Sequence, residues 1–225
     1  GRAEPPGGAE PSGRAEPPGG AEPSGRAEPP GGAEPSGRAE PPGVDPLIEQ
    51  AIDTVLLAAG FEVVEVAIPG WEAAWRTGIV LLEAEAAQSN RHLLGDLDQL
   101  DPAVAARLRR GARASAASIA AARAHQRAWQ GELDRALSGV DALVLPTMVS
   151  FPPSFEAAER FPFTLLTGPV NLAGLPALSL PVPAPGPSGL PASLQLVGPA
   201  NSEEALLATG AAIESAAAGL AATRP

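Results

Sequence analysis

The chain has 225 residues and a formal net charge of -11, with Lys+Arg 15 against Asp+Glu 26. An acidic surface repels phosphate backbones and anionic lipids, so we expect neither nucleic acid nor a membrane as a partner. Cysteine is absent, which excludes disulfides, thiol nucleophiles and thiolate zinc sites. The start lacks a signal-peptide pattern, and no uninterrupted apolar stretch approaches the roughly 18 residues of a membrane span, so we expect a soluble cytoplasmic protein.

Residues 1–43 are built from a repeat. The 12-residue unit GRAEPPGGAEPS begins at Gly1, Gly13 and Gly25, and a shorter fourth copy begins at Gly37. The segment contains no Leu, Ile, Val, Phe, Trp or Met, so it cannot offset the conformational entropy that is lost on folding. We predict a disordered linker over 1–43 and a folded region over 44–225. A docking arm for a proline-binding module is the alternative to a simple spacer.

The folded region opens with a predicted helix and strand. Asp45 is a suitable N-cap, Pro46 can take the first helical position, and an apolar stripe then continues to Gly60, which ends the helix. The next segment, FEVVEVAIP at 61–69, alternates apolar and polar residues and is rich in β-branched side chains. This pattern predicts a β-strand.

Three helices are predicted next. Apolar residues recur every three or four positions over about 71–94, which indicates a long amphipathic helix. Asp101 and Pro102 form a second helix start. An alanine-rich helix is predicted over about 112–137 and is ended by Gly139.

The remaining pattern adds strands. DALVLPT at 141–147 is a short apolar run that suits a buried strand of a sheet covered by helices. ALSLPV at 177–182 and ASLQLVG at 192–198 are two further strands, which the loop at 183–191 links as a pair. Strands that alternate with helices predict an α/β fold.

A last helix is predicted near the C-terminal end of the sequence. Asn201 and Glu204 have the spacing of a capping box, and an apolar stripe follows them. The stripe consists of Ala205, Leu206, Leu207, Ala211 and Ile213.

Several of these segments together resemble the C-terminal half of the amidase signature family. They are DALVLPT, then FTLLTGPVNLAGLPALSLPV, then GLPASLQLVGPANSEEALLATGAAIE, in that order and spacing. Upstream, VDPLIEQAIDTVLLAAGFEVVEVAIP is similar to the helix and strand that begin the second half of these enzymes. The resemblance covers most of residues 44–217 and implies a mixed sheet wrapped in helices.

The resemblance also implies a reaction: hydrolysis of carboxamides by a serine nucleophile in a Ser-cis-Ser-Lys triad, with the oxyanion held by a glycine- and serine-rich loop. Both the loop and the lysine belong to the N-terminal half of the family and are absent here. All 15 basic residues are arginines. A guanidinium stays protonated at physiological pH and cannot act as the base. We therefore assign no catalytic residue to this chain and expect it to be inactive alone.

Other chemistry has less support. His92 and His125 are the only imidazoles; we expect His125 to face solvent and His92 to complement a helix end. Glu83 and Glu85 are two residues apart on a helix, so they do not face each other and we expect both to be solvated. The sequence has no metal-binding, nucleotide-binding or lipase-type motif, so we predict no metal and no cofactor.

Four residues of the family-like segment are candidates for the substrate pocket or its frame. Thr167 lies where related enzymes bring side chains toward the substrate, which the resemblance implies as a substrate-binding role. Asn171, Gly174 and Pro176 are interpreted as a structural motif that shapes the turn into the next strand, because Asn can bond its own backbone and Gly tolerates positive φ.

Two functional hypotheses follow. The first is a truncated or rearranged amidase homologue whose intact relatives hydrolyse a small amide. Half of a single sheet would expose an unpaired edge, so this hypothesis also predicts aggregation or marginal folding. The second is a noncatalytic module or split subunit that binds another polypeptide carrying the missing catalytic half.

Overall fold

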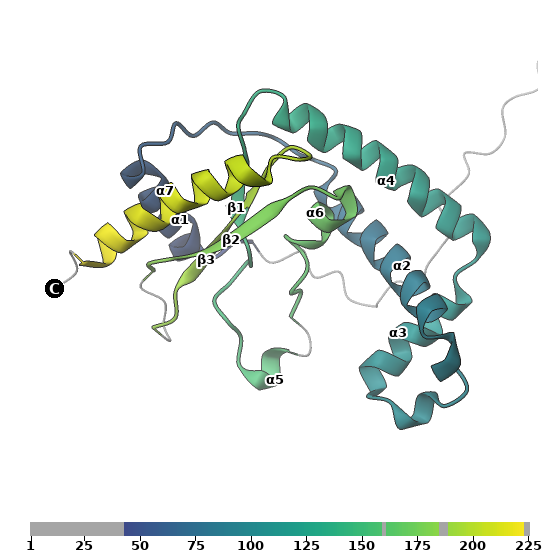
Figure 1. The fold of residues 1–225 in the computed structure, drawn as a ribbon. Helices are drawn as coiled ribbons and strands as arrows, with labels where there is room; N and C mark the ends of the chain where they lie inside the picture. Colours follow the sequence, from purple (N-terminus) through teal and green to yellow (C-terminus); the bar gives the residue numbers. More distant parts are fainter. Residues whose placement is uncertain (1–42, 159–160, 185–188, 223–225) are drawn as a thin grey trace, which may run out of the picture. The chain divides into compact units, whose positions relative to one another are not determined.

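A computed structural model describes residues 43–158, 161–184 and 189–222. These residues belong to one compact unit of the chain. The predicted disorder of residues 1–43 falls almost entirely outside the described residues. Within them, helices and a small sheet form the α/β arrangement that the sequence predicts, and Figure 1 traces the order of the elements.

The first helix, α1 (Pro46–Ala58), begins and ends as the sequence predicts. The Asp45 side chain accepts a hydrogen bond from the backbone N–H of Leu47 at 2.9 Å, and Pro46 occupies the first turn. After the helix, Gly60 takes a φ of 79°, a left-handed conformation that glycine adopts without a side-chain clash. Local chemistry alone therefore fixes both ends of α1.

The strand predicted over 61–69 is wrong. Residues 61–68 have no regular secondary structure, although their sequence alternates as a strand would. Val63 and Val64 are 61% and 55% exposed. A strand is held by a ladder to a neighbour, and this segment has no ladder partner among the described residues. The α1–α2 connection runs across the top of the view in Figure 1.

The helices that follow differ from the prediction only at their ends. Helix α2 (Trp71–Ser89) stops before Leu94, because Asn90 caps it and donates a side-chain hydrogen bond to the Ala86 carbonyl at 2.9 Å. Two short 3-10 turns, η1 (Arg91–Leu93) and η2 (Leu97–Gln99), lead to α3 (Pro102–Arg113). Helix α4 (Ala116–Leu137) starts at the N-cap Ser115, later than predicted.

Over the described part of the chain, the sheet has three antiparallel strands in the order β1-β3-β2. They are β1 (Leu143–Pro146), β2 (Ala177–Val182) and β3 (Ala192–Val197), each at its predicted place. Leu143 and Ala177 both lie opposite Val197, so β3 is the centre. Strand β1 was expected to be buried, but among the described residues it is an edge strand, with Val144 37% exposed.

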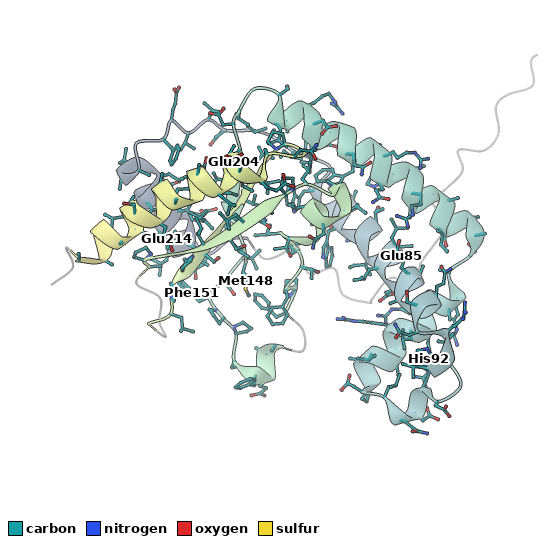
Figure 2. The ribbon with its side chains drawn as sticks, viewed as in Figure 1. Glu85, His92, Met148, Phe151, Glu204 and Glu214 are labelled. Atoms are coloured by element: carbon teal, nitrogen blue, oxygen red, sulfur yellow. The ribbon has the colours of Figure 1, made fainter. Side chains whose placement is uncertain are left out.

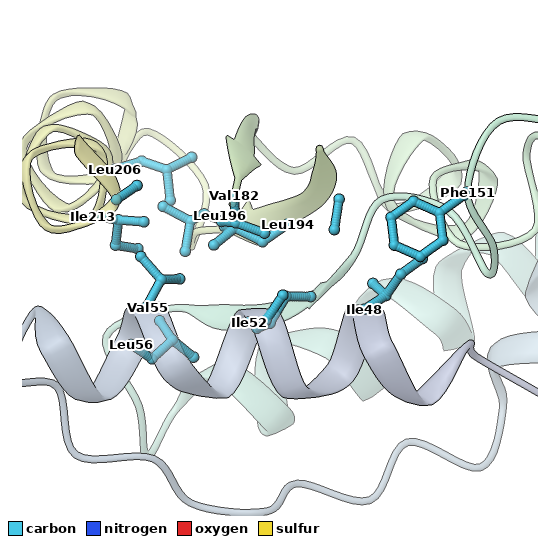
Figure 3. Packing of buried hydrophobic residues seen from close by; sticks show 13 residues of the cluster. Ile48, Ile52, Val55, Leu56, Phe151, Val182, Leu194, Leu196, Leu206 and Ile213 are labelled. Atoms are coloured by element: carbon cyan, nitrogen blue, oxygen red, sulfur yellow. The ribbon is translucent and has the colours of Figure 1, made fainter. Parts of the chain in front are cut away.

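Two apolar cores cover the two faces of this sheet. On one face, α1 and α7 (Glu203–Ala222) pack against alternate residues of β2 and β3, and Figure 3 shows their side chains meeting between the helices and the strands. On the other face, α2, α4 and α6 (Gly168–Ala173) enclose Trp129 and Leu143. Trp71 and Trp129 meet edge to face at 5.5 Å in this second core. The short helix α5 (Phe155–Ala158) lies outside both cores.

The start of α7 corrects the predicted capping box. The helix begins at Glu203, and the carbonyl of Ser202 accepts the first helical bond from Leu206 at 2.9 Å, so Ser202 holds the N-cap position. Asn201 instead takes a left-handed conformation with φ 63°. After glycine, Asn tolerates the left-handed region of backbone conformation best. Asn201 therefore forms the turn before α7 instead of capping the helix.

Helix α7 also meets the length and composition of a membrane span, and among the described residues no other helix does. Its apolar run is not uninterrupted, because Glu214 lies within it. One face of α7, including Leu206 and Ile213, is buried against the sheet. Such a helix is weak evidence for a membrane span.

The contact between α2 and α3 depends on one glycine. A Cβ on Gly111 would overlap the backbone carbonyl of Glu83 and come within 3.0 Å of the Ala87 side chain. Gly111 is buried. The two helices thus approach closely because residue 111 has no side chain.

We expect Gly111→Ala to destabilise the fold by about 1–3 kcal/mol, because the added methyl group forces two helix backbones apart. Gly131→Ala is the matched control, since Gly131 lies inside α4 and a Cβ there meets open space. The control should stabilise the protein by about 0.5–1 kcal/mol through helix propensity. Urea unfolding followed by circular dichroism measures both, and equal midpoints for the two variants would contradict the close-approach argument.

Candidate functional site

A polar patch interrupts the otherwise apolar strands. Because side chains alternate between faces, Ser193 and Gln195 of β3 share a face with Ser179 of β2 and with Thr147, just beyond β1. The same face becomes apolar toward Val197, where α4 and α6 cover it. The polar residues therefore gather where this cover ends.

Three hydroxyl groups meet in this patch, and we call Thr147, Ser179 and Ser193 the hydroxyl cluster. Thr147 Oγ1 lies 2.9 Å from Ser193 Oγ and donates to Ser179 Oγ at 3.3 Å. The backbone also fixes the pair, because Thr147 N–H donates to the Ser193 carbonyl at 2.9 Å. Thr147 and Ser193 are half-buried and Ser179 is exposed. Hydroxyls both donate and accept hydrogen bonds, so the cluster can bind a polar ligand such as a carboxamide.

Gln195 connects the hydroxyl cluster to the turn before α6. Its side chain is the one buried polar group of the described core, in a residue 3% exposed. Gln195 Nε2 donates to the Leu166 carbonyl at 3.3 Å. This bond crosses from β3 to the segment that carries Thr167. Leu166, whose carbonyl accepts the bond, directly precedes the predicted substrate residue Thr167.

Thr167 stands at the N-cap of α6 and is half-buried. Its carbonyl accepts a hydrogen bond from Asn171 N–H at 3.1 Å, but its hydroxyl makes no capping bond. Among the described residues, no hydrogen bond engages that hydroxyl. A substrate-binding role for Thr167 stays a prediction.

The other three predicted residues have structural positions. Asn171 lies inside α6 and is exposed, rather than in the turn that follows the helix. Gly174 ends α6 with φ 75°, and its N–H donates to the Val170 and Asn171 carbonyls. The Pro176 carbonyl accepts from Gly198 N–H at 3.1 Å, which anchors the start of β2 beside β3. Gly174 and Pro176 thus shape the entry to β2.

Neither histidine belongs to this site. His125 was expected to face solvent, but it is half-buried and its Nδ1 lies 2.9 Å from Thr77 Oγ1. The Thr77 hydroxyl also donates to the Ala73 carbonyl at 2.9 Å, so the imidazole is the donor in the first contact. His125 joins α4 to α2. His92 is exposed in η1, and Figure 2 shows it beside α3, away from Met148, which follows Thr147 in the chain.

Glu83 and Glu85 of α2 are both paired with arginines. Arg110 Nε contacts the two carboxylate oxygens of Glu83 at 3.0 and 3.1 Å, and Arg123 pairs with Glu85. The Glu83 side chain is only 12% exposed, so the expectation that it is solvated was wrong. Its hydrogen bond raises the pKa of Arg110 above the ordinary value, against a smaller lowering by burial. These pairs brace the helices and do not reach the hydroxyl cluster.

The hydroxyl cluster can form hydrogen bonds to a ligand, but no general base lies beside it among the described residues. A hydroxyl becomes a nucleophile only when an adjacent group takes its proton. No described His, Asp or Glu is hydrogen-bonded to Thr147, Ser179 or Ser193, and the 225 residues contain no lysine. Over the described part of the chain, no group of three His, Cys, Asp or Glu residues could hold a metal ion.

Sequence reasoning missed the hydroxyl cluster. Its members come from segments about 30 and 14 residues apart in the chain, so no linear motif contains them. A signal was present in the alternation of ALSLPV and ASLQLVG, where Ser179, Ser193 and Gln195 recur on the face opposite the leucines. Reading the two predicted strands as a pair would have placed these polar side chains together.

Comparisons with known proteins agree with this fold. The Amidase family model matches residues 36–207. The A subunit of glutamyl-tRNA(Gln) amidotransferase from Halobacterium salinarum is 39% identical over 94 residues, which are 39% of this chain and 22% of that protein. Its counterpart from Microcystis aeruginosa is 44% identical over 92 residues, or 38% of this chain and 18% of that protein.

Solved structures extend the likeness. A structure titled "Crystal structure of amidase" has a TM-score of 0.67 and 28% identity, and the match covers 76% of this chain and 42% of that one. This chain therefore spans less than half the length of its relatives. The family match nevertheless takes in the hydroxyl cluster, the turn at Thr167, the core around Trp129 and most of the other core, whose Ile213 and Ala217 lie beyond it. The chain belongs to the amidase signature family.

Proposed function

We propose that this chain supplies the substrate-side wall of an amide hydrolase and does not itself break the amide bond. The observation that carries the proposal is a family match over 36–207 in a sequence without a single lysine. The hydroxyl cluster and Thr167 are the residues that would contact a small carboxamide.

The chemistry of the patch supports an amide ligand. A carboxamide presents a carbonyl oxygen that accepts and an N–H that donates, and each hydroxyl of the cluster can meet either group. Thr167 adds a further hydroxyl that is free of protein hydrogen bonds among the described residues. The buried Gln195 holds the turn of Thr167 against the sheet. Binding groups on rigid elements hold a substrate in one orientation.

The reaction requires groups from elsewhere. The resemblance to the family implies that a serine proton passes through a second serine to a lysine amine while the serine oxygen attacks the amide carbon. The C–N bond then breaks, the nitrogen leaves with a proton, and water hydrolyses the ester to a carboxylate. No arginine of this chain can accept the first proton. A polypeptide that carries the lysine and the glycine- and serine-rich loop must complete the site.

Two versions of this function remain to be distinguished. The chain is either an inactive piece of an amidase or a split subunit that works with a catalytic partner. The open edge of β1 is expected in both versions, because half of a single sheet leaves an edge strand without its neighbour. That the chain aggregates when alone, and that it resides in the cytoplasm, both stay predictions.

The purified full chain should release no ammonia from short aliphatic and aromatic primary amides above the rate of buffer. The physical reason is the missing base and oxyanion loop, since such losses remove several orders of magnitude in rate. A glutamate-dehydrogenase-coupled assay measures the release. A mock purification from cells without the gene controls for contaminating amidases, and turnover found only with the chain would refute the proposal.

Mixed with the catalytic portion of an amidase, the chain should restore turnover, and Thr167→Ala should weaken substrate use. Losing one hydrogen bond of about 1–2 kcal/mol predicts a KM raised roughly 5- to 30-fold with kcat changed far less. Thr54→Ala is the control, because Thr54 is exposed on α1 and bonds only its own helix. An unchanged KM in Thr167→Ala would remove Thr167 from the substrate wall.

A further inference from the structure

Arginine is concentrated at one end of the folded region. Residues 91–127 contain seven arginines and three aspartates, a net charge of +4 in a chain whose total is -11. The arginines are densest on α3, whose buried residues are Ala105, Leu108 and Gly111. Because each residue turns a helix by about 100°, the four arginines of α3 lie on the opposite, exposed side. We call Arg107, Arg109, Arg110 and Arg113 the arginine face.

Three members of the arginine face are available to a partner. Arg107 and Arg113 have no hydrogen bond or ion pair among the described residues. Arg109 Nη2 lies 3.1 Å from Asp98 Oδ1, but the Asp98 side chain is 99% exposed. Such a pair contributes little, because water competes for both groups. Arg110 is committed to its largely buried glutamate partner on α2.

The other end of the described unit carries only acidic charge. Residues 44–70 and 189–222 contain eight acidic residues and no basic residue. These ranges include α1 and α7, which pack on the same core, and Figure 1 shows both helices at the opposite end of the unit from α3. None of the described ion pairs involves these eight carboxylates. A protein surface normally intersperses charges of both signs, so this separation is unusual.

The two ends match in spacing as well as in sign. Arg109 and Arg113 are four residues apart on α3, and Glu49 and Asp53 are four residues apart on α1. Residues at this spacing lie on one side of a helix, about 5–6 Å apart. All four residues are exposed. Two such helices side by side can form two guanidinium–carboxylate pairs at once, and each pair can use two N–H groups of the arginine.

A second copy of the chain is the partner that these observations favour. The two ends cannot meet within one chain, because α3 packs on α2, far from α1. A nucleic acid would meet a chain that is acidic elsewhere, and the arginine face has no aromatic side chain on which a base could stack. Repulsion between the net charges of two copies is weak at physiological salt, because charges more than about 8 Å apart are largely screened.

We propose that the arginine face binds α1 of a second copy of this chain, with Arg109 and Arg113 paired to Glu49 and Asp53. The contact joins different surfaces of the two copies, so a dimer keeps one free arginine face and one free α1. Further copies can therefore add head to tail. The inference is independent of the proposed function, because neither surface includes the hydroxyl cluster or Thr167.

Sedimentation velocity of the full chain tests the association. In about 0.02 M sodium chloride, the weight-average sedimentation coefficient should rise as the protein concentration is raised from about 10 μM to about 1 mM. Sodium sulfate at about 0.2 M should abolish the rise, because it screens surface ion pairs. Sulfate strengthens the burial of apolar surface, so aggregation through an apolar edge would respond in the opposite way. Association that persists or grows in sulfate would contradict the proposal.

Charge reversal identifies the two surfaces. The double variant Arg109→Glu with Arg113→Glu should stay monomeric at low salt, and so should Glu49→Arg with Asp53→Arg, because each places like charges opposite one another. An equimolar mixture of the two double variants should associate again, since every contact between them regains opposite charges. A mixture that stays monomeric would overturn the pairing.

The control separates a local contact from a change in net charge. Arg127→Glu with Arg135→Glu changes the net charge as much as the reversal on α3, and both arginines are exposed on α4. This control should associate with a Kd within about twofold of the unchanged chain. Equal loss in the control and in the α3 variant would show a net-charge effect and refute the contact.

Folding of each variant is checked by circular dichroism. If arginines on α1 unfold the chain, the neutral pair Glu49→Gln with Asp53→Asn takes their place and should raise the Kd for self-association by about tenfold. An unchanged Kd in that variant would remove α1 from the contact. A chain that is monomeric at low salt and at every concentration would sink the inference and leave the proposed function standing.

Discussion

Both cores of this chain and its candidate site depend on the double pairing of β3. Leu194 and Leu196 are fully buried against α1 and α7, while Val197 is buried on the opposite face against α4 and α6. A strand can be buried on both faces only when neighbours satisfy its backbone on both edges. Because β1 and β2 do this, the polar side chains of β3 are held in fixed positions beside apolar ones.

The buried Gln195 shows how this constraint creates a site. An amide side chain inside a core costs free energy unless it finds a partner, and Gln195 finds the Leu166 carbonyl. That bond fixes the turn before α6 relative to the sheet. Thr167 and the hydroxyl cluster therefore belong to one rigid framework, although they come from four separate stretches of the chain.

The elements predicted from the sequence are those with local causes. Asp45, Pro46 and Gly60 fix α1 by themselves, and the two strands near the C-terminal end carry alternating patterns within a few residues. The prediction of a strand over 61–69 was wrong. The alternating pattern is present, but a strand also needs a neighbouring strand for its hydrogen-bond ladder, and a local pattern does not supply one. The prediction that Asn201 caps α7 was wrong for a different reason, because the Asn side chain suits both a helix cap and a left-handed turn.

The candidate site was only partly predictable. Thr167 was predicted from the family resemblance, because its segment is contiguous, and its substrate role stays a prediction. The hydroxyl cluster was not, because its members meet only once β1, β3 and β2 are in register. His125 was misjudged because its burial depends on how α4 crosses α2, and an amphipathic stripe does not fix the position of a residue at its border.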